Sequence, residues 1–243
     1  MMLKDYKTSL SVLRKKNDKS FSSKLLNYLI NPQKIFSRLL WEINKYDLEL
    51  NWHDRVSEMG NSAVFASNVS IKEQKKLTKI HEKMILKVLK NKLKKKAKLL
   101  DFGCGYGRFK NLFEKKLFLD YLGVEKENLF LNNLNKKKFL KFDDFKRIKK
   151  FNNYFDLIFV WEVLGGFNDK NIKQIIKILK KKLSKNGIIC FVDIVSKKEK
   201  QEVGWRFRTV DYYKSLFNGY SINSDYYFFE DSQKKVFFLI SKN

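Results

Sequence analysis

Proline, cysteine and histidine are scarce in this sequence. Its 243 residues include one proline, two cysteines and two histidines. Two cysteines, Cys104 and Cys190, are too few for the disulfide framework of a small secreted domain, so we expect reduced thiols and no metal site. No apolar run reaches the roughly 18 residues that span a membrane, and no signal-peptide core follows the first residues. These absences favour a soluble, cytoplasmic protein.

Acidic residues are few relative to basic ones. The chain has 52 lysines and arginines against 26 acidic residues, a formal net charge of +26. Such a balance favours binding to phosphate backbones. Only seven of the basic residues are arginine, which is the preferred forked ligand of phosphate. Nucleic acid is therefore the less favoured partner, and a small molecule is preferred.

The length and an apolar content of 44% favour one α/β domain with an extension. Apolar residues at helical spacing over residues 21–47 predict two short amphipathic helices around Asn31-Pro32. Such basic helices can dock on a membrane surface or on a partner, although packing on the main domain is favoured. We expect a helical extension and substrate lid over residues 1–70 and the main domain over 71–243.

Three of the ten glycines fall at alternate positions of one segment. Gly103, Gly105 and Gly107 follow the predicted strand 98–102 and precede a predicted helix. Glycine lets the backbone approach a ligand closely, and a helix start offers free N–H groups. The segment therefore predicts a nucleotide-type cofactor site. Arg108 occupies the sixth position, where a dinucleotide fingerprint requires glycine.

Strands and helices alternate along the rest of the chain. Apolar runs predict strands buried on both faces of a parallel sheet, followed by an antiparallel pair. The predicted strands are 98–102, 120–124, 139–142, 155–161, 188–193, 226–229 and 236–240. The predicted helices are 71–93, 108–116, 128–135, 171–183 and one that begins at Thr209 and ends at Gly219.

Asp101 followed by the three glycines resembles the first motif of the class I S-adenosylmethionine (AdoMet) methyltransferases. Acidic residues at the ends of the next strands, Glu125 and Asp143-Asp144, and Trp161-Glu162 after the fourth, are similar to that family. The resemblance covers about residues 72–243. It implies an α/β, Rossmann-like fold whose seven-stranded sheet has the order 3-2-1-4-5-7-6, with the last strand antiparallel.

The resemblance also implies the cofactor and its ligands. AdoMet would be the methyl donor and S-adenosylhomocysteine the product. Glu125 would accept hydrogen bonds from the ribose hydroxyls, and Asp143, favoured over Asp144, would lie near the adenine amino group. The implied cofactor-binding residues are Asp101, Gly103, Cys104, Gly105, Gly107, Glu125, Asp143, Asp144 and Trp161.

Methyl transfer from a sulfonium requires alignment and exclusion of water more than acid catalysis. Glu162 and His53 are the candidates for a base, whereas His81 is expected to be a structural or surface residue. The candidates for substrate binding are Trp52 and Arg55 in the lid, and Arg206 and Arg208, which share a face of an extended segment and can hold an anionic group.

The turn after the fourth predicted strand lacks the Asn/Asp-Pro-Pro-aromatic motif associated with amino methylation of DNA bases, and neither cysteine is placed for carbon methylation. A narrower resemblance, in residues 52–56, 163–166 and 205–209, is to bacterial small-molecule methyltransferases. We therefore expect O- or N-methylation of a small molecule, with a sugar or sugar phosphate of surface polysaccharide synthesis as one class. The alternatives are an RNA methyltransferase and a non-catalytic subunit that binds a partner; the oligomeric state stays open.

Overall fold

The computed structural model describes residues 48–65, 69–132, 134–135 and 137–243. The helices predicted over 21–47, and any docking role for them, lie outside the described residues. None of the helices in the described ranges is long and apolar enough to cross a membrane.

The strands are β1 (Lys98–Phe102), β2 (Asp120–Glu125), β3 (Phe139–Lys141), β4 (Phe155–Trp161), β5 (Leu183–Val195), β6 (Lys200–Glu202), β7 (Trp205–Phe207), β8 (Tyr220–Glu230) and β9 (Gln233–Lys242). The α-helices are α3 (Leu48–Met59), α4 (Ile71–Leu89), α5 (Asn128–Leu131), α6 (Phe142–Arg147), α7 (Asp169–Lys182) and α8 (Val210–Ser215). Short helical turns are η2 (Gly60–Val64), η3 (Leu112–Lys116), η4 (Lys149–Phe151) and η5 (Leu164–Gly166).

The main sheet has seven strands in the order β3-β2-β1-β4-β5-β9-β8. Neighbours from β3 to β5 are parallel, and β9 runs antiparallel to both β5 and β8. This confirms the predicted order, because the hairpin β6–β7 forms a sheet of its own and shifts the numbering of the last two strands. The chain therefore has a Rossmann-like α/β fold.

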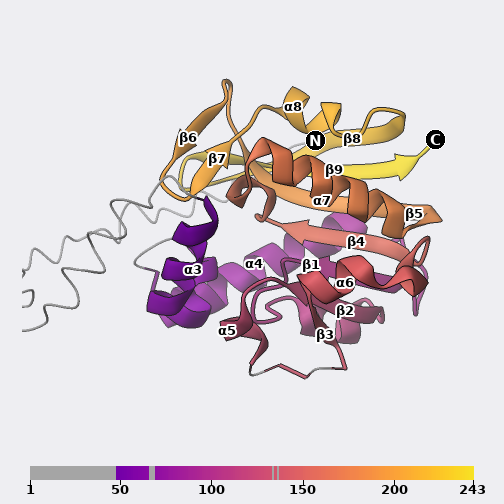
Figure 1. The fold of residues 1–243 in the computed structure, drawn as a ribbon, viewed down its shortest axis with the longest axis horizontal. Coiled ribbons are helices and arrows are strands. Elements are labelled where there is room, and N and C mark those ends of the chain that lie inside the picture. Colours follow the sequence, from indigo (N-terminus) through magenta and orange to yellow (C-terminus); the bar gives the residue numbers. More distant parts are fainter. Residues whose placement is uncertain (1–47, 66–68, 133, 136) are drawn as a thin grey trace, which may run out of the picture.

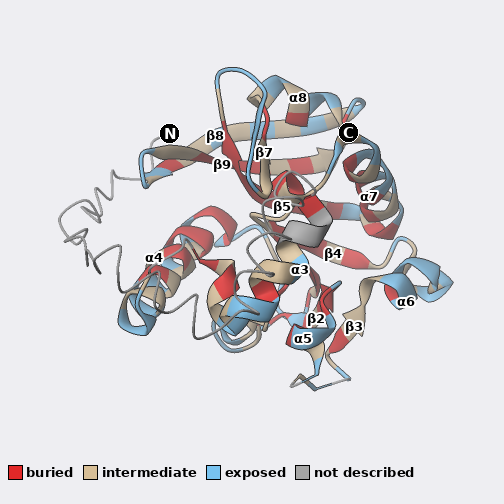
Figure 2. Ribbon diagram, turned by 60° about the vertical axis from the view of Figure 1, so that its left-hand side comes forward, coloured by how far each residue is buried: buried red, intermediate tan, exposed pale blue. Residues whose placement is uncertain are grey.

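Helices cover both faces of the sheet (Figures 1 and 2). Successive strand residues point to opposite faces, so β4 contributes to two cores. Ile158 and Val160 pack with α7, and Leu157 and Phe159 pack with α4. Both sets are fully or almost fully buried. This continuous burial explains why the apolar runs of the sequence locate the central strands well.

The helices differ more from the prediction than the strands do. Ser70 caps α4 and forms a reciprocal capping box with Glu73, so the helix begins where predicted. After the glycine loop, however, the expected regular helix is replaced by turns and the π-helical η3. Gly107 has a φ of +79°, which keeps the backbone out of the right-handed helix at that point.

Arg206 and Arg208 do share a face, but the anion they meet is the protein's own. Arg206 lies 2.9 Å from one Asp169 oxygen and Arg208 lies 2.9 Å from the other. Arg208 is fully buried and also donates to the carbonyls of Leu164 at 3.1 Å and Phe167 at 2.6 Å. The prediction that these arginines bind substrate is corrected: they fasten β7 to η5 and α7.

This arrangement predicts unequal effects of two similar mutations. Arg208→Met leaves two carbonyls without their donor, so we expect a loss of about 3 kcal/mol in the free energy of unfolding. Arg206→Met removes a partly exposed ion pair and is expected to cost less than about 1 kcal/mol. Urea unfolding of both variants measures the difference. Equal losses would contradict the anchoring role of Arg208.

Candidate functional site

The glycine loop lies at the carboxyl end of β1, in the middle of the sheet (Figure 1). Gly103 and Gly105 have φ values of +72° and +55°, which other residues rarely adopt. A β-carbon on Gly103 would lie 2.4 Å from the Val163 side chain, and one on Gly105 would lie 3.2 Å from Val64. Glycine is therefore required here both by the backbone and by the close approach of neighbouring elements.

Glu125, the last residue of β2, holds this loop from beneath. Its buried carboxylate accepts hydrogen bonds from the backbone N–H of Gly105 at 2.7 Å, Lys126 at 2.7 Å and Glu127 at 3.1 Å. Burial raises the pKa of Glu125, and the three N–H donors oppose that rise. This carboxylate joins the end of β2 to the loop after β1, and the Val124 carbonyl adds to the junction by accepting from Gly103 N–H at 2.8 Å and Cys104 N–H at 3.2 Å.

Asp101 lies in the strand just before the loop and is almost fully buried. The Tyr121 hydroxyl donates to its carboxylate at 2.9 Å. Burial raises the pKa of Asp101 to about 7, because the hydrogen bond from Tyr121 offsets only part of the loss of hydration. Burial also raises the pKa of the Cys104 thiol well above its usual range, so this buried free cysteine stays protonated.

A cavity of about 600 Å³ joins the glycine loop to the ends of β2, β4, β8 and β9. Seven of the predicted cofactor-binding residues line it: Asp101, Gly103, Cys104, Gly105, Glu125, Asp143 and Trp161. Gly107 and Asp144 lie outside the lining. Asp143 is exposed in the first turn of α6, where a hydrogen bond from Lys146 at 2.6 Å lowers its pKa.

Residues 48–65 belong to the segment predicted to be a substrate lid. Trp52 and Arg55, on α3, both line the cavity. Arg55 donates from Nε to the Ala63 carbonyl at 2.9 Å and from Nη2 to the Phe65 carbonyl. These bonds fasten α3 to the segment around η2, and they use the Nε and Nη2 donors of Arg55.

His53 points elsewhere. Its side chain is 58% exposed, and Nδ1 lies 3.0 Å from the Glu127 carboxylate. It is not among the residues that line the cavity. The structure therefore gives no support to His53 as a base.

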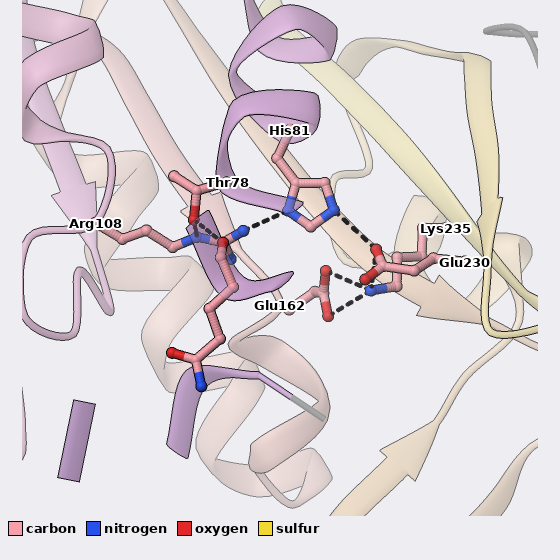
Figure 3. Close-up of polar contacts among 7 residues, drawn as sticks. Thr78, His81, Arg108, Glu162, Glu230 and Lys235 are labelled. Carbon is pink, nitrogen blue, oxygen red and sulfur yellow. Dashed lines mark hydrogen bonds and ion pairs between the residues drawn. The ribbon is translucent and has the colours of Figure 1, made fainter. Parts of the chain in front are cut away.

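Five cavity-lining side chains form what we call the charged chain: Arg108, His81, Glu230, Lys235 and Glu162 (Figure 3). Arg108 Nη2 lies 2.5 Å from His81 Nδ1, and His81 Nε2 lies 2.8 Å from Glu230. Lys235 Nζ donates to Glu230 at 3.0 Å and to both oxygens of Glu162 at 2.8 and 2.9 Å. The charged chain connects the glycine loop, α4, β8, β9 and the end of β4.

The hydrogen bonds fix the protonation of His81. A guanidinium only donates, so Nδ1 must accept from Arg108 and the imidazole is neutral, with its Nε2–H donating to Glu230. Burial lowers the pKa of His81, in keeping with the neutral form. His81 is therefore a buried structural residue and is not free to act as a base.

Lys235 and Glu230 stay charged in spite of burial. Burial lowers the pKa of the Lys235 ammonium, but Glu162 and Glu230 outweigh this and raise it above its usual value. Burial raises the pKa of Glu230, and the bonds from His81 and Lys235 bring it below its usual value. Paired in this way, buried charges avoid the cost of standing alone.

Glu162 directly follows β4 and has a φ of +51°, unusual for a residue with a side chain. Its N–H donates to the Val192 carbonyl of β5 at 2.8 Å. The backbone bond and the two contacts to Lys235 hold the carboxylate at the cavity wall. Strained residues held in this way are often found at functional sites.

Trp205 lines the cavity and packs against Gly165. Its ring lies so close to Gly165 that a β-carbon there would come within 2.1 Å of it. Its Nε1 is buried and has no hydrogen-bond partner among the described residues, which is costly.

Sequence reasoning missed most of the charged chain. Arg108 served only to exclude a dinucleotide, and Glu230, Lys235 and Trp205 were not predicted as site residues. A usable signal was present for Lys235. It directly precedes the predicted strand 236–240 and lies two residues before Phe237, so strand periodicity continued by one residue places both on one apolar face. A lysine on such a face requires anionic partners.

Comparisons with known proteins agree with this geometry. The family model described as "Methyltransferase domain" matches residues 73–222. A search of curated protein sequences finds no match.

Several solved structures share the fold. An S-adenosylmethionine-dependent methyltransferase from Leishmania major is 18% identical with a TM-score of 0.61, covering 84% of this chain and 91% of its own. A protein from Pyrococcus horikoshii is 15% identical with a TM-score of 0.57, covering 75% and 98%. Phosphoethanolamine N-methyltransferase 1 from Haemonchus contortus, in complex with phosphoethanolamine and S-adenosylhomocysteine, is 13% identical with a TM-score of 0.59, covering 83% and 50%.

Asp101 gives the site a testable pH dependence. Its folded pKa is about 7, whereas an unfolded aspartate ionises near pH ~4. The folded protein therefore holds an extra proton between these values, and the stabilisation is lost as pH rises through this window. We expect Asp101→Asn to lose less stability than wild type between pH 5 and pH 8 in urea unfolding.

Asp120→Asn, at an exposed position, is the matched control and should show the same loss of stability between pH 5 and pH 8 as the wild type. The Asp101 variant keeps part of the fall, because burial also raises the pKa of Asp193 to about 7. An identical fall in wild type and Asp101→Asn would contradict the assignment.

Proposed function

Because this chain belongs to the methyltransferase domain family, as a class I AdoMet-dependent methyltransferase, we propose that it transfers a methyl group to an oxygen or nitrogen of a small molecule. A sugar or sugar phosphate is the acceptor class we favour. The observation that carries the proposal is the single cavity that joins Glu125 and the glycine loop to the charged chain. One end suits a nucleoside-type cofactor, and the other offers polar groups to a second molecule.

The residues present fit AdoMet. The glycine loop leaves space that a β-carbon at Gly105 would narrow against Val64, and Glu125 places a carboxylate beside it for the ribose hydroxyls. Asp143 would accept a hydrogen bond from the adenine amino group, and Trp161 would contact the cofactor at the end of β4. The bound cofactor supplies a methyl group activated by the sulfonium.

The protein's part in the reaction is then alignment and exclusion of water. Trp52 and Arg55 on α3, and Trp205 on β7, line the cavity on segments outside the main sheet. We propose that these segments cover the bound molecules.

Glu162 is our candidate for the group that accepts the acceptor's proton. It lines the cavity, and Lys235 contacts both of its oxygens. This pairing fixes the direction of the carboxylate. Lone pairs left by Lys235 would accept a hydrogen bond from a hydroxyl or amine and orient it for attack on the methyl carbon.

RNA remains the second candidate acceptor because the net charge is +26. Methylation of RNA would depend steeply on salt, since binding releases counterions. The partner-subunit alternative rests on residues 21–47, which lie outside the described residues, and turnover by the isolated chain would exclude it.

Two mutants test the cofactor assignment. Glu125→Ala removes the carboxylate that we expect to accept hydrogen bonds from the ribose hydroxyls. Hydrogen bonds to a charged group are comparatively strong, so we expect S-adenosylhomocysteine affinity to fall about 10- to 100-fold. Gly105→Val fills the space beside the glycine loop and is expected to abolish binding. Titration calorimetry measures both, with the partly exposed Glu114→Ala as control. Wild-type affinity in both variants would overturn the assignment.

Glu162→Gln tests the proposed proton acceptor. The amide keeps the shape of the side chain but is far less basic, so we expect kcat to fall about 100-fold or more, with little change in S-adenosylhomocysteine affinity. Glu199→Gln, on an exposed side chain outside the cavity lining, is the control. An unchanged kcat would limit Glu162 to a structural role.

A further inference from the structure

Arg108 has donors that the protein does not use. Its Nε donates to Thr78 Oγ1 at 3.1 Å and its Nη2 to His81 Nδ1 at 2.5 Å. A guanidinium carries further N–H groups in the same plane, and Nη1 has no hydrogen-bond partner within the described part of the chain. Arg108 lines the cavity, and Nη1 is not among the buried unpartnered atoms. The free donors therefore face accessible space.

The charge of Arg108 is likewise unmatched by direct contact. Thr78 is uncharged and His81 is neutral, as its hydrogen bonds require. No carboxylate of the described residues lies within 4.0 Å of the guanidinium, while burial lowers its pKa. An arginine stays protonated under these conditions, so a partly buried cation stands without an ion-pair partner.

The surroundings of the guanidinium leave its edge as the direction of approach. The Phe65 and Phe109 rings lie 4.5 and 4.7 Å from its central carbon, close enough for cation–π contact. Thr78 and His81 fix its orientation from α4. A planar fork held in this way is suited to an oxyanion such as phosphate or carboxylate.

The other arginines near the cavity lie apart from the charged chain. Arg55 donates from Nε and Nη2 to the Ala63 and Phe65 carbonyls, within its own segment. Arg206 and Arg208 meet Asp169. The carboxylates whose charge acts on Arg108 are Glu162, Glu230 and Glu82, the first two from the charged chain. Arg108 is thus linked to the part of the cavity where we place the acceptor.

We propose that Arg108 binds a phosphate or carboxylate group of the methyl acceptor. The inference rests on the proposed function and narrows its substrate class. Arg108 stands at one end of the charged chain and Glu162 at the other (Figure 3). An acceptor that carries an anionic group and, apart from it, a hydroxyl or amine would meet both ends at once. Phosphorylated or carboxylated alcohols and amines are such molecules.

Inorganic phosphate is the probe. It is titrated calorimetrically into the full-length protein saturated with S-adenosylhomocysteine, so that the cofactor's own carboxylate is already in place. We expect Arg108→Gln to weaken phosphate binding at least tenfold and leave S-adenosylhomocysteine affinity unchanged. Lys110→Gln removes a nearby charge that does not line the cavity and should behave as wild type.

A second variant guards against misfolding. Arg108→Lys keeps the charge but loses the fork, so it should fold and show an intermediate loss of phosphate binding. Phosphate binding unchanged in both Arg108 variants, or absent from the wild type, would overturn the proposal.

A cofactor role for Arg108 would give a different pattern. If Arg108→Gln weakens S-adenosylhomocysteine but not 5′-methylthioadenosine, which lacks the carboxylate, the guanidinium holds the cofactor and the acceptor site is refuted. If the wild type fails to bind S-adenosylhomocysteine, the proposed function is refuted instead. Phosphate binding measured in the absence of S-adenosylhomocysteine would still test the role of Arg108.

Discussion

The Glu125 carboxylate accepts a hydrogen bond from the N–H of Gly105 and so joins the end of β2 to the loop that follows β1. A buried carboxylate is stable only when hydrogen-bonded, and here the partners are all backbone groups. The glycine loop has no regular helix to hold it, since turns and a π-helical segment follow. The part of the cavity where we propose the cofactor therefore depends on this carboxylate, on the Val124 carbonyl that accepts from Gly103 and Cys104, and on the glycines that let the loop approach β2.

The part of the cavity where we propose the methyl acceptor depends on how its positive and negative side chains are paired. The charged chain contains two cations, Arg108 and Lys235, and two carboxylates, Glu162 and Glu230, around a neutral His81. Lys235 contacts both carboxylates, whereas Arg108 contacts none of them directly. Arg108 is therefore the end of the charged chain that can still pair with an anion. A methyl acceptor with an anionic group would complete this balance.

The central sheet could be predicted because strands that are buried on both faces consist of continuous apolar runs. Strands β1 and β4 have the predicted bounds, and Glu125 and Trp161 lie at the cavity as their places at strand ends required. Arg206 and Arg208 show the limit of this reasoning. Alternation correctly placed them on one face, but the identity of their anion, Asp169, depends on a contact with α7 that local sequence does not encode.

The charged chain escaped prediction for the same reason. Its members lie far apart in the sequence and meet only because β8 and β9 pack beside β5, opposite α4. His81 is an example: as one residue of a helix it gave no sign of the carboxylate at position 230 or of Arg108. Side-chain chemistry at such a junction follows from tertiary packing rather than from periodicity.

We propose that this protein transfers a methyl group from AdoMet to a small anionic acceptor. The most informative measurement is release of S-adenosylhomocysteine from AdoMet by the purified protein, with a panel of phosphorylated and carboxylated alcohols, amines and nucleotide sugars as acceptors and with their uncharged counterparts and RNA as comparators. We expect turnover with an anionic small molecule that persists between about 50 and about 200 mM salt, a range over which RNA binding weakens steeply. Turnover with RNA alone, or with the uncharged counterparts alone, would contradict the proposal.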